Sequence, residues 1–264
     1  MKKFVLINSP LFWERTNEEE EYLSPLGLGY ISTYLKKVGL EVLLLDSVKE
    51  RLGVEDILKQ VSEIKPEFVG INVFTQNYEL VQYIIEKMSI QCECFVGGQV
   101  VKSIYETILY WKTSNKVNII IGEGELIIPA IVLENCKEKP IEHLDNKFVY
   151  KVDRNSQYFP EDISKIYLDR SFLKNAIINN HYGEKEAAII TSRGCAYDCA
   201  CSGCLLIVYF QIKRKSPVND AFMGLFFYTC KTNYKKVDVQ KMRINGCAFV
   251  QFFVFFLKTR NIVP

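Results

Sequence analysis

Four cysteines stand close together in the run TSRGCAYDCACSGC: Cys195, Cys199, Cys201 and Cys204. Thiolates are the ligands of iron–sulfur clusters and of soft metal ions. The start of the chain, MKKFVLINSP, is better interpreted as a first strand than as a signal peptide. We therefore expect a cytoplasmic location, where clustered cysteines are reduced and serve as metal ligands rather than disulfides.

The cysteine run leaves three interpretations open. An iron–sulfur cluster is the first. The second is a non-catalytic binding module with a small structural zinc knot, because four thiolates satisfy tetrahedral zinc. Structural zinc usually draws on two separated ligand pairs, so one compact run is less favourable. The third is that the cysteines bind nothing. Iron uptake on anaerobic reconstitution, or zinc without iron, distinguishes the first two.

The elements that precede the cysteines alternate between short aliphatic runs and longer amphipathic stretches. Strands are predicted over 4–7, 41–45, 68–73, 94–96 and 118–121, and helices over 28–38, 54–64, 78–88, 104–111 and 127–135. In the helix over 54–64 the apolar residues recur at i, i+3, i+4 and i+7, which is one face of a helix. Apolar strands alternating with helices predict a doubly wound, flavodoxin-like parallel sheet of five strands.

Small and polar residues follow each of the five predicted strands. Ligands of such sheets bind beyond the carboxyl ends of the strands, so these residues are candidate cofactor ligands. Any one turn could need Gly or Asn simply to turn, but five together favour a ligand crevice. They are Asn8 and Ser9, Asp46 and Ser47, Asn72, Thr75 and Gln76, Gly97, Gly98 and Gln99, and Gly122, Glu123, Gly124 and Glu125.

The rest of the chain is divided by composition. We expect the first domain over 1–136, a polar connector with one short helix over 137–186, and a buried strand leading into the cysteines over 187–204. The tail, 205–264, is rich in Phe, Tyr and Lys, has no clear helix or strand period, and need not be ordered. Its basic charge contrasts with the acidic remainder of the chain.

Several segments together resemble B12-binding radical SAM proteins. The first domain resembles their N-terminal cobalamin-binding domain in LINSP, SPLGLGYISTYLKKVGLEVLLLD, KPEFVGINVFT, VGGQ and IIIGEGE, and TSRGCAYDC resembles the start of their radical SAM domain. The resemblance implies a [4Fe–4S] cluster that binds and reductively cleaves S-adenosylmethionine. It also implies cobalamin, and a radical modification such as methylation of an unactivated carbon.

The family spacing of cluster ligands, C-x3-C-x2-C, is only partly present. Cys195 and Cys199 match the first two ligands, but the third position is Ser202. Cys201 is slightly favoured over Cys204 as the displaced third ligand. The tail also lacks the remainder of the partial β/α barrel, of which only a fragment is expected. We therefore expect a frameshift near codon 200 and a chain that is incomplete as an enzyme.

The implied cobalamin would lack a histidine ligand from the protein. Modules that ligate cobalt through His carry Asp-x-His-x-x-Gly, whereas this chain has Asp46-Ser47-Val48. The two histidines, His143 and His181, lie in the connector and are interpreted as surface residues. Glu123 and Glu125 are expected to contact a cofactor or cap the next helix.

Other features give weaker indications. Cys92, Cys94 and Cys136 are interpreted as small apolar residues of the structure. No apolar segment reaches the roughly 18 residues that span a bilayer, so no membrane partner is expected. The basic tail lacks a nucleic-acid recognition motif, so nucleic acid is not an expected partner. If the chain is active, an electron donor and a substrate of unidentified type are its partners.

Overall fold

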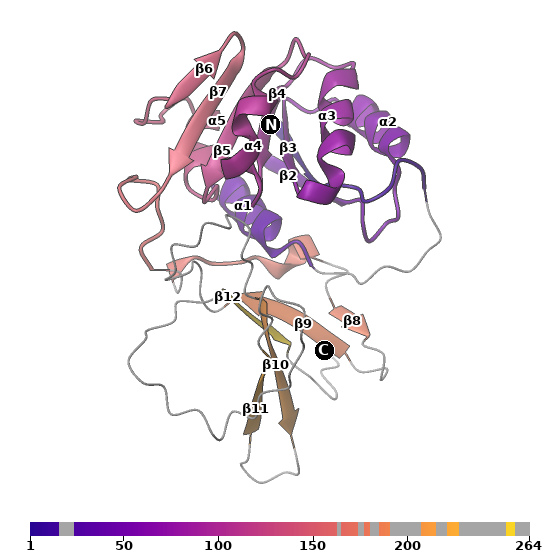
Figure 1. Cartoon of the computed structure of the whole chain (residues 1–264), viewed down its shortest axis with the longest axis vertical. Helices are drawn as coiled ribbons and strands as arrows, with labels where there is room; N and C mark the ends of the chain where they lie inside the picture. The colour runs from indigo at the N-terminus through magenta and orange to yellow at the C-terminus, as the bar shows by residue number, and fades with distance from the viewer. Residues whose placement is uncertain are drawn as a thin grey trace. The chain divides into compact units, whose positions relative to one another are not determined.

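The computed structural model describes residues 1–15, 24–162, 165–173, 177–179, 185–190, 207–214, 221–226 and 252–256. The chain divides into two compact units, Met1–Leu173 and Lys174–Pro264 (Figure 1). The first unit carries the candidate cofactor ligands.

The first unit is built on a seven-stranded sheet with the order β2-β1-β3-β4-β5-β7-β6. Strands β1 to β5 are parallel to their neighbours and confirm the five predicted strands and the 2-1-3-4-5 order of a flavodoxin-like sheet. Their bounds are Lys3–Asn8 (β1), Glu41–Asp46 (β2), Phe68–Asn72 (β3), Glu93–Gly97 (β4) and Lys116–Gly122 (β5).

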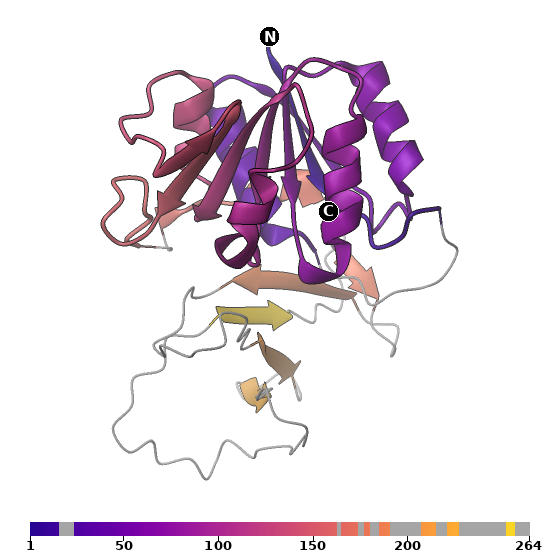
Figure 2. The ribbon, with the colours of Figure 1, turned by 45° about the horizontal axis from the view of Figure 1, so that its top comes forward.

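Helices cover both faces of this sheet (Figure 2). Alternate residues of one strand serve opposite faces: Val5 and Ile7 pack in one core, and Phe4 and Leu6 in the other. The first core contains buried residues of α2, α3 and α4, and the second those of α1 and α5. The helices are Leu26–Lys37 (α1), Val54–Ile64 (α2), Tyr78–Lys87 (α3), Val101–Ile108 (α4) and Ile127–Val132 (α5), with a 3-10 turn, Thr75–Asn77 (η1), before α3.

A hairpin that was not predicted extends the sheet. Strand β7 (Lys147–Val152) runs parallel to β5, and β6 (Glu142–Leu144) pairs antiparallel with β7. Both lie in the stretch that was interpreted as a polar connector. In β7 the buried residues Lys147 and Val149 alternate with half-buried neighbours, but only over six residues. That alternation is too short to stand out between the flanking polar segments.

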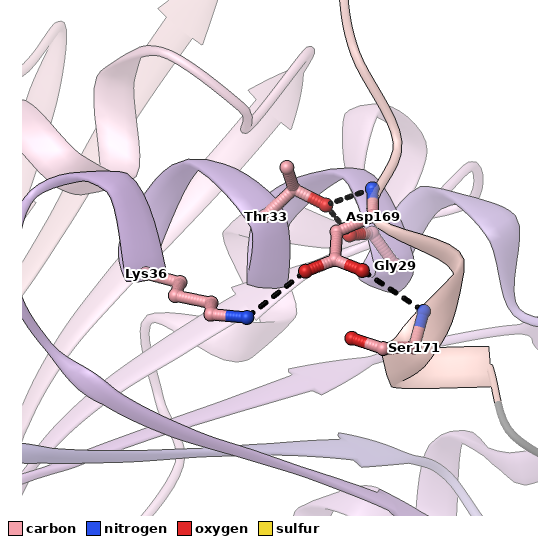
Figure 3. Close-up of polar contacts among 5 residues, drawn as sticks. All are labelled: Gly29, Thr33, Lys36, Asp169 and Ser171. Atoms are coloured by element: carbon pink, nitrogen blue, oxygen red, sulfur yellow. Dashed lines mark hydrogen bonds and ion pairs between the residues drawn. The ribbon is translucent and has the colours of Figure 1, made fainter.

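The segment that follows the hairpin is held on α1 by a cluster of polar contacts (Figure 3). The hydroxyl of Thr33 donates to the carbonyl of Gly29 at 2.8 Å and accepts the backbone N–H of Asp169 at 2.9 Å. The Asp169 carboxylate accepts from the Lys36 ammonium at 3.0 Å and from the backbone N–H of Ser171 at 3.0 Å. Asp169 directly precedes the 3-10 turn η3 (Arg170–Leu173), which contains Ser171.

The absence of a side chain at Gly29 lets this segment approach closely. A Cβ there would lie 2.9 Å from Leu168 Cδ1 and 3.2 Å from Leu173 Cδ1. Leu173 is buried, at 6 % exposed. The segment is therefore fixed to α1 by apolar packing as well as by the Asp169 contacts.

We predict that the Asp169 contacts weaken in acid. Hydrogen bonds from Ser171 and then from Lys36 lower the pKa of Asp169 from its ordinary 3.8 to about 2. A lowered pKa stabilises the folded form above the ordinary value, and that contribution is lost as the pH falls from 3.8 toward about 2. Asp169→Asn should therefore lower the free energy of unfolding by about 1 kcal/mol at neutral pH. The difference from wild type, measured by urea unfolding, should shrink toward zero as the pH falls through about 2.

Asp162→Asn is the matched control for this prediction. Asp162 pairs with Lys165 at 3.7 Å between two more exposed side chains, so its loss should change stability by less. An Asp169→Asn effect that is constant from neutral pH to pH 2 would show that the ionised carboxylate is not responsible.

The second unit contains a five-stranded sheet in the order β11-β10-β12-β9-β8. Strand β9 (Lys185–Ile190) corresponds to the strand predicted before the cysteines, and β8 (Ile177–Asn179) pairs antiparallel with it. Strands β10 (Ile207–Arg214), β11 (Ala221–Phe226) and β12 (Phe252–Phe256) lie in the tail, where no strand period was recognised. Their uninterrupted apolar runs, such as FFVFF, show no alternation from which a strand could be predicted. The expected barrel fragment stays a prediction.

Among the described residues, no helix is both long and apolar enough to cross a membrane.

Candidate functional site at the carboxyl edge of the sheet

The carboxyl ends of β1, β2 and β3 are joined by a chain of side-chain hydrogen bonds. Asn8, at the end of β1, donates from Nδ2 to Asp46 Oδ1 at 2.8 Å. Asn8 Oδ1 in turn accepts a hydrogen bond from Asn72 Nδ2 at 3.0 Å. Strands β1 and β3 flank the point where the strand order reverses, which is where ligands bind in sheets of this topology. Three of the predicted ligand residues, Asn8, Asp46 and Asn72, therefore meet at the edge where a ligand is expected.

A second set of bonds fixes the loop after β1. The backbone N–H of Ser9 donates to Asn72 Oδ1 at 2.7 Å, and the Ser9 hydroxyl accepts from Asn77 Nδ2 at 2.6 Å. Asn77 also accepts the backbone N–H of Phe74 at 2.9 Å. Asn77 is 0 % exposed. It was missed in the sequence, although an Asn directly before an amphipathic helix is a recognised start signal.

The turn after β2 contains a buried hydroxyl with an unusual environment. Ser47 is 1 % exposed, and its Oγ has no hydrogen-bond partner among the residues that the structure describes. Its backbone N–H donates to the carbonyl of Asn8 at 3.3 Å, so the turn is anchored to β1. In the same turn, partial burial and then the Asp46 carboxylate raise the pKa of Glu50. A buried hydroxyl normally has a partner, so Ser47 Oγ is a candidate ligand contact.

The turn after β4 depends on the absence of side chains. Gly98 has a φ of +132°, and a Cβ there would collide with the carbonyl oxygen of Val73. Gly97 accepts the backbone N–H of Val73 at 2.7 Å, which ties the ends of β3 and β4 together. A Cβ on Gly97 would meet only the Ile120 carbonyl oxygen, at 3.8 Å. A methyl group thus fits at Gly97 in ordinary contact but collides with the backbone at Gly98.

The turn after β5 leads directly into α5. Gly122 has a φ of +100°, and a Cβ there would collide with the carbonyl oxygen of Val152 in β7. The carbonyl of Gly124 accepts the backbone N–H of Ile128 at 3.1 Å, so the helical turns begin at this glycine. Glu125 is 3 % exposed, whereas Glu123 is half-buried. The acidic side chains therefore lie in different environments.

The remaining predicted residues lie on the surface. Thr75, Gln76 and Gln99 are exposed. They follow the ends of β3 and β4, so they remain at this edge without joining the hydrogen-bonded network described above. The structure thus divides the predicted ligands into an interconnected set at β1, β2 and β3, glycine turns at β4 and β5, and exposed polar residues.

No histidine of the described residues lies at the carboxyl edge of the sheet. His143 is exposed in β6 and pairs with Phe148, which is in register with Asn118 near the start of β5. It therefore lies toward the amino end of the sheet. Its ring stacks on Phe148 with centroids 6.2 Å apart. His181 lies outside the described residues.

The described part of the first unit has no metal site built from His, Cys, Asp and Glu side chains alone. Within the described ranges, no group of three or more His, Cys, Asp or Glu side chains could hold a metal ion. Cys195, Cys199, Cys201 and Cys204 lie outside these ranges. The predicted cluster site therefore stays a prediction.

One family model matches the first unit. Residues 17–132 match the model described as the B12 binding domain. This match spans β2 to β5 and the five helices, and ends at the last residue of α5. No curated protein matches.

Solved structures that match part of this chain include two of the cobalamin-dependent S-adenosylmethionine radical enzyme OxsB. One contains aqua-cobalamin and S-adenosylmethionine and matches with 17 % identity and a TM-score of 0.43. The other contains aqua-cobalamin and matches with 17 % identity and a TM-score of 0.41. Each match covers 61 % of this chain and 24 % of the OxsB chain. A third is the radical S-adenosylmethionine methyltransferase TsrM from Kitasatospora setae with cobalamin and a [4Fe-4S] cluster. It has 17 % identity and a TM-score of 0.39, with 73 % of this chain and 30 % of that one covered. The chain thus spans less than a third of the length of each.

Proposed function

We propose, because residues 17–132 match the model of the B12 binding domain, that this chain binds cobalamin at the carboxyl edge of its sheet, as part of a cobalamin-dependent radical SAM system. The observation that carries the proposal is the coincidence of this family match with polar and glycine residues at all five strand ends. Cobalamin supplies a cobalt centre that can carry a methyl group.

The residues at this edge suit the chemistry of cobalamin. The corrin ring is surrounded by amide side chains, which pair with hydroxyl, amide and backbone groups of a protein. Ser47 Oγ, a buried oxygen with no partner in the described structure, is suitable for such a hydrogen bond, and Gly97 presents backbone without a side chain at the end of β4. Asn8 and Asn72 would hold the strand ends in place around it.

The proposed binding mode requires no histidine from the protein. Asp46-Ser47-Val48 takes the place of a His-containing motif, and His143 lies toward the other end of the sheet. We therefore expect that His143→Ala leaves the visible spectrum of the bound cobalamin unchanged. The buried Ser47 side chain would instead contribute a hydrogen bond to the periphery of the ligand.

The test is binding of methylcobalamin, in the dark, to the full chain. Co-elution in gel filtration and saturation in equilibrium dialysis are the expected results. Methylcobalamin is the suitable probe because its methyl group occupies the cobalt face that cysteine thiolates could otherwise attack. A chain that is folded by circular dichroism and fails to retain methylcobalamin would refute the proposal.

Ser47→Ala should change stability and affinity in opposite directions. Removing a buried hydroxyl that lacks a partner should raise the free energy of unfolding of the cobalamin-free protein by about 1 kcal/mol. The same change should weaken methylcobalamin binding about tenfold if the hydroxyl serves the ligand. Urea unfolding and equilibrium dialysis measure the two effects.

Ser32→Ala is the matched control. Ser32 is 0 % exposed in α1, and its Oγ also lacks a partner among the described residues. Because it lies in the body of α1 and not at a strand end, its replacement should raise stability similarly and leave affinity unchanged. Equal affinities for wild type and Ser47→Ala would exclude Ser47 as a ligand contact.

The catalytic part of the proposal rests on the cysteine run and its resemblance to radical SAM proteins. Cys195 and Cys199 would be ligands of a [4Fe–4S] cluster, with Cys201 or Cys204 as the third. Anaerobic reconstitution with iron and sulfide should give a brown protein, and Cys199→Ala should abolish iron uptake. Zinc content without iron uptake would favour the structural zinc knot. An electron donor and a carbon substrate complete the proposed system.

A further inference from the structure

Three sulfur atoms meet at the amino end of β4, the opposite end of the sheet from the candidate cofactor site. Cys92 Sγ lies 3.3 Å from Met88 Sδ and 3.7 Å from Cys94 Sγ. Met88 directly follows α3, Cys92 precedes β4, and Cys94 lies within β4. Met88 and Cys92 belong to the short connection between α3 and β4, and Cys94 is the second residue of β4, so neighbouring parts of the chain bring the sulfur atoms together.

This group, Met88, Cys92 and Cys94, is largely shielded from water. Cys94 is 0 % exposed and belongs to the core beneath α2, α3 and α4, against which the other two pack. The backbone of the connection between α3 and β4 is also fixed by hydrogen bonds to Asn115, a residue outside this connection that is 2 % exposed. Its Oδ1 accepts the backbone N–H of Cys92 at 3.2 Å, and its Nδ2 donates to the Ile90 carbonyl at 3.0 Å. The sulfur atoms are therefore positioned before any ligand arrives.

Two thiols and a thioether form a ligand set for a soft cation. Thiolate and thioether sulfurs select soft ions such as Cu(I) and also bind zinc, but structural zinc almost always takes four ligands, which leaves Cu(I) as the better match to three sulfurs. The neighbouring Glu93 carboxylate is engaged by the Lys116 ammonium at 2.7 Å and by Asn118 Nδ2 at 2.6 Å, so it is not positioned as a fourth ligand.

The observed separations suit three-coordinate sulfur ligation. A trigonal metal with bonds of about 2.3 Å to sulfur holds its ligands about 4 Å apart. The two distances from Cys92 Sγ are 3.3 Å to Met88 Sδ and 3.7 Å to Cys94 Sγ, so these two separations must lengthen by only a few tenths of an ångström. Met88 can provide this movement because its side chain is unbranched and flexible.

We propose that Met88, Cys92 and Cys94 form a binding site for a single soft monovalent cation, with Cu(I) as its probe. Binding replaces the thiol protons of Cys92 and Cys94 with two metal–sulfur bonds and adds a third bond from the Met88 thioether. Two protons are released to solvent, and no atom changes oxidation state. The site is independent of cobalamin, because it lies at the other end of β4.

The experiment measures labelling of Cys92 by N-ethylmaleimide in the full chain, with and without stoichiometric Cu(I) under anaerobic conditions. Tryptic digestion places Cys92 and Cys94 together in the peptide MSIQCECFVGGQVVK, separate from the cysteine run. Peptide-resolved mass spectrometry therefore distinguishes this site from copper bound elsewhere. We expect Cu(I) to slow Cys92 labelling at least about tenfold, and Met88→Leu to remove most of that protection.

Cys136 is the internal control, because it is a partly buried thiol in a different peptide. Its labelling should not change with copper. Met88→Leu conserves volume and should fold, and unchanged methylcobalamin binding would establish this separately. The proposal is overturned if Cu(I) leaves Cys92 labelling unchanged or if Met88→Leu is protected as well as wild type. A peptide that is lighter by two hydrogens under reducing conditions would also overturn it, because it would identify a Cys92–Cys94 disulfide.

Discussion

Gly98→Ala is expected to lower the free energy of unfolding by about 3 kcal/mol. The φ of +132° at Gly98 is one that residues with a side chain rarely adopt. A Cβ there would also meet backbone atoms of Val73: the carbonyl oxygen, and the nitrogen at 2.9 Å. Because these are backbone atoms, they cannot rotate away, and the bond from Val73 N–H to the Gly97 carbonyl would be displaced. Urea unfolding followed by circular dichroism measures the loss.

Gly97→Ala is the matched control, one residue away and with the same added methyl group. Its Cβ would lie 3.8 Å from the Ile120 carbonyl oxygen, which is an ordinary contact, and its φ lies outside the left-handed region. Its stability should remain within about 1 kcal/mol of wild type. Equal effects of the two substitutions would mean that the backbone conformation of Gly98 is not the cause.

Asn8→Ala should have the second-largest effect, again about 3 kcal/mol. Asn8 is only 5 % exposed and makes side-chain bonds to both Asp46 and Asn72. Its removal leaves a carboxylate and an amide with reduced hydrogen bonding in a partly buried position. It should also weaken methylcobalamin binding, because the ends of β1, β2 and β3 would no longer be held in register. Unfolding and dialysis experiments measure the two quantities.

Asn8→Asp provides a more specific test of the same network. The new carboxylate would replace an amide that donates to Asp46 at 2.8 Å, so two like charges would face each other. This variant should be least stable at neutral pH and recover as acid protonates one of the pair. Thr75→Ala, at an exposed position of the same edge, should leave stability nearly unchanged. An Asn8→Asp variant as stable as wild type at neutral pH would contradict the Asn8–Asp46 bond.

Much of the architecture of the first unit was predictable because its physical signals are local. Val54, Ile57 and Val61 recur at helical spacing, and all three are buried in α2. Continuous apolar runs such as those of β1 and β5 predicted strands covered on both faces. The hairpin of β6 and β7 was missed because its alternation is brief and its buried Lys147 conceals it.

The candidate site was predictable as a set of positions but not as a set of interactions. The carboxyl ends of parallel strands share one edge, so any residue at those ends belongs to the site once the strand order is known. The interactions depend on side-chain placement. Asn8 bonds both Asp46 and Asn72, and Asn77 donates a hydrogen bond to Ser9. Ser47 is buried without a partner in the described structure.

The sequence by itself determined a parallel α/β sheet, its strand-end residues and the resemblance to cobalamin-binding proteins, because periodicity and motif spacing are properties of neighbouring residues. Only the tertiary structure decided how those residues divide into a bonded network, strained glycine turns and exposed side chains. It also brought the sulfur atoms of Met88 and Cys94 into contact with that of Cys92. Such contacts depend on packing between elements, and in the sequence these sulfurs could be interpreted only as small apolar groups.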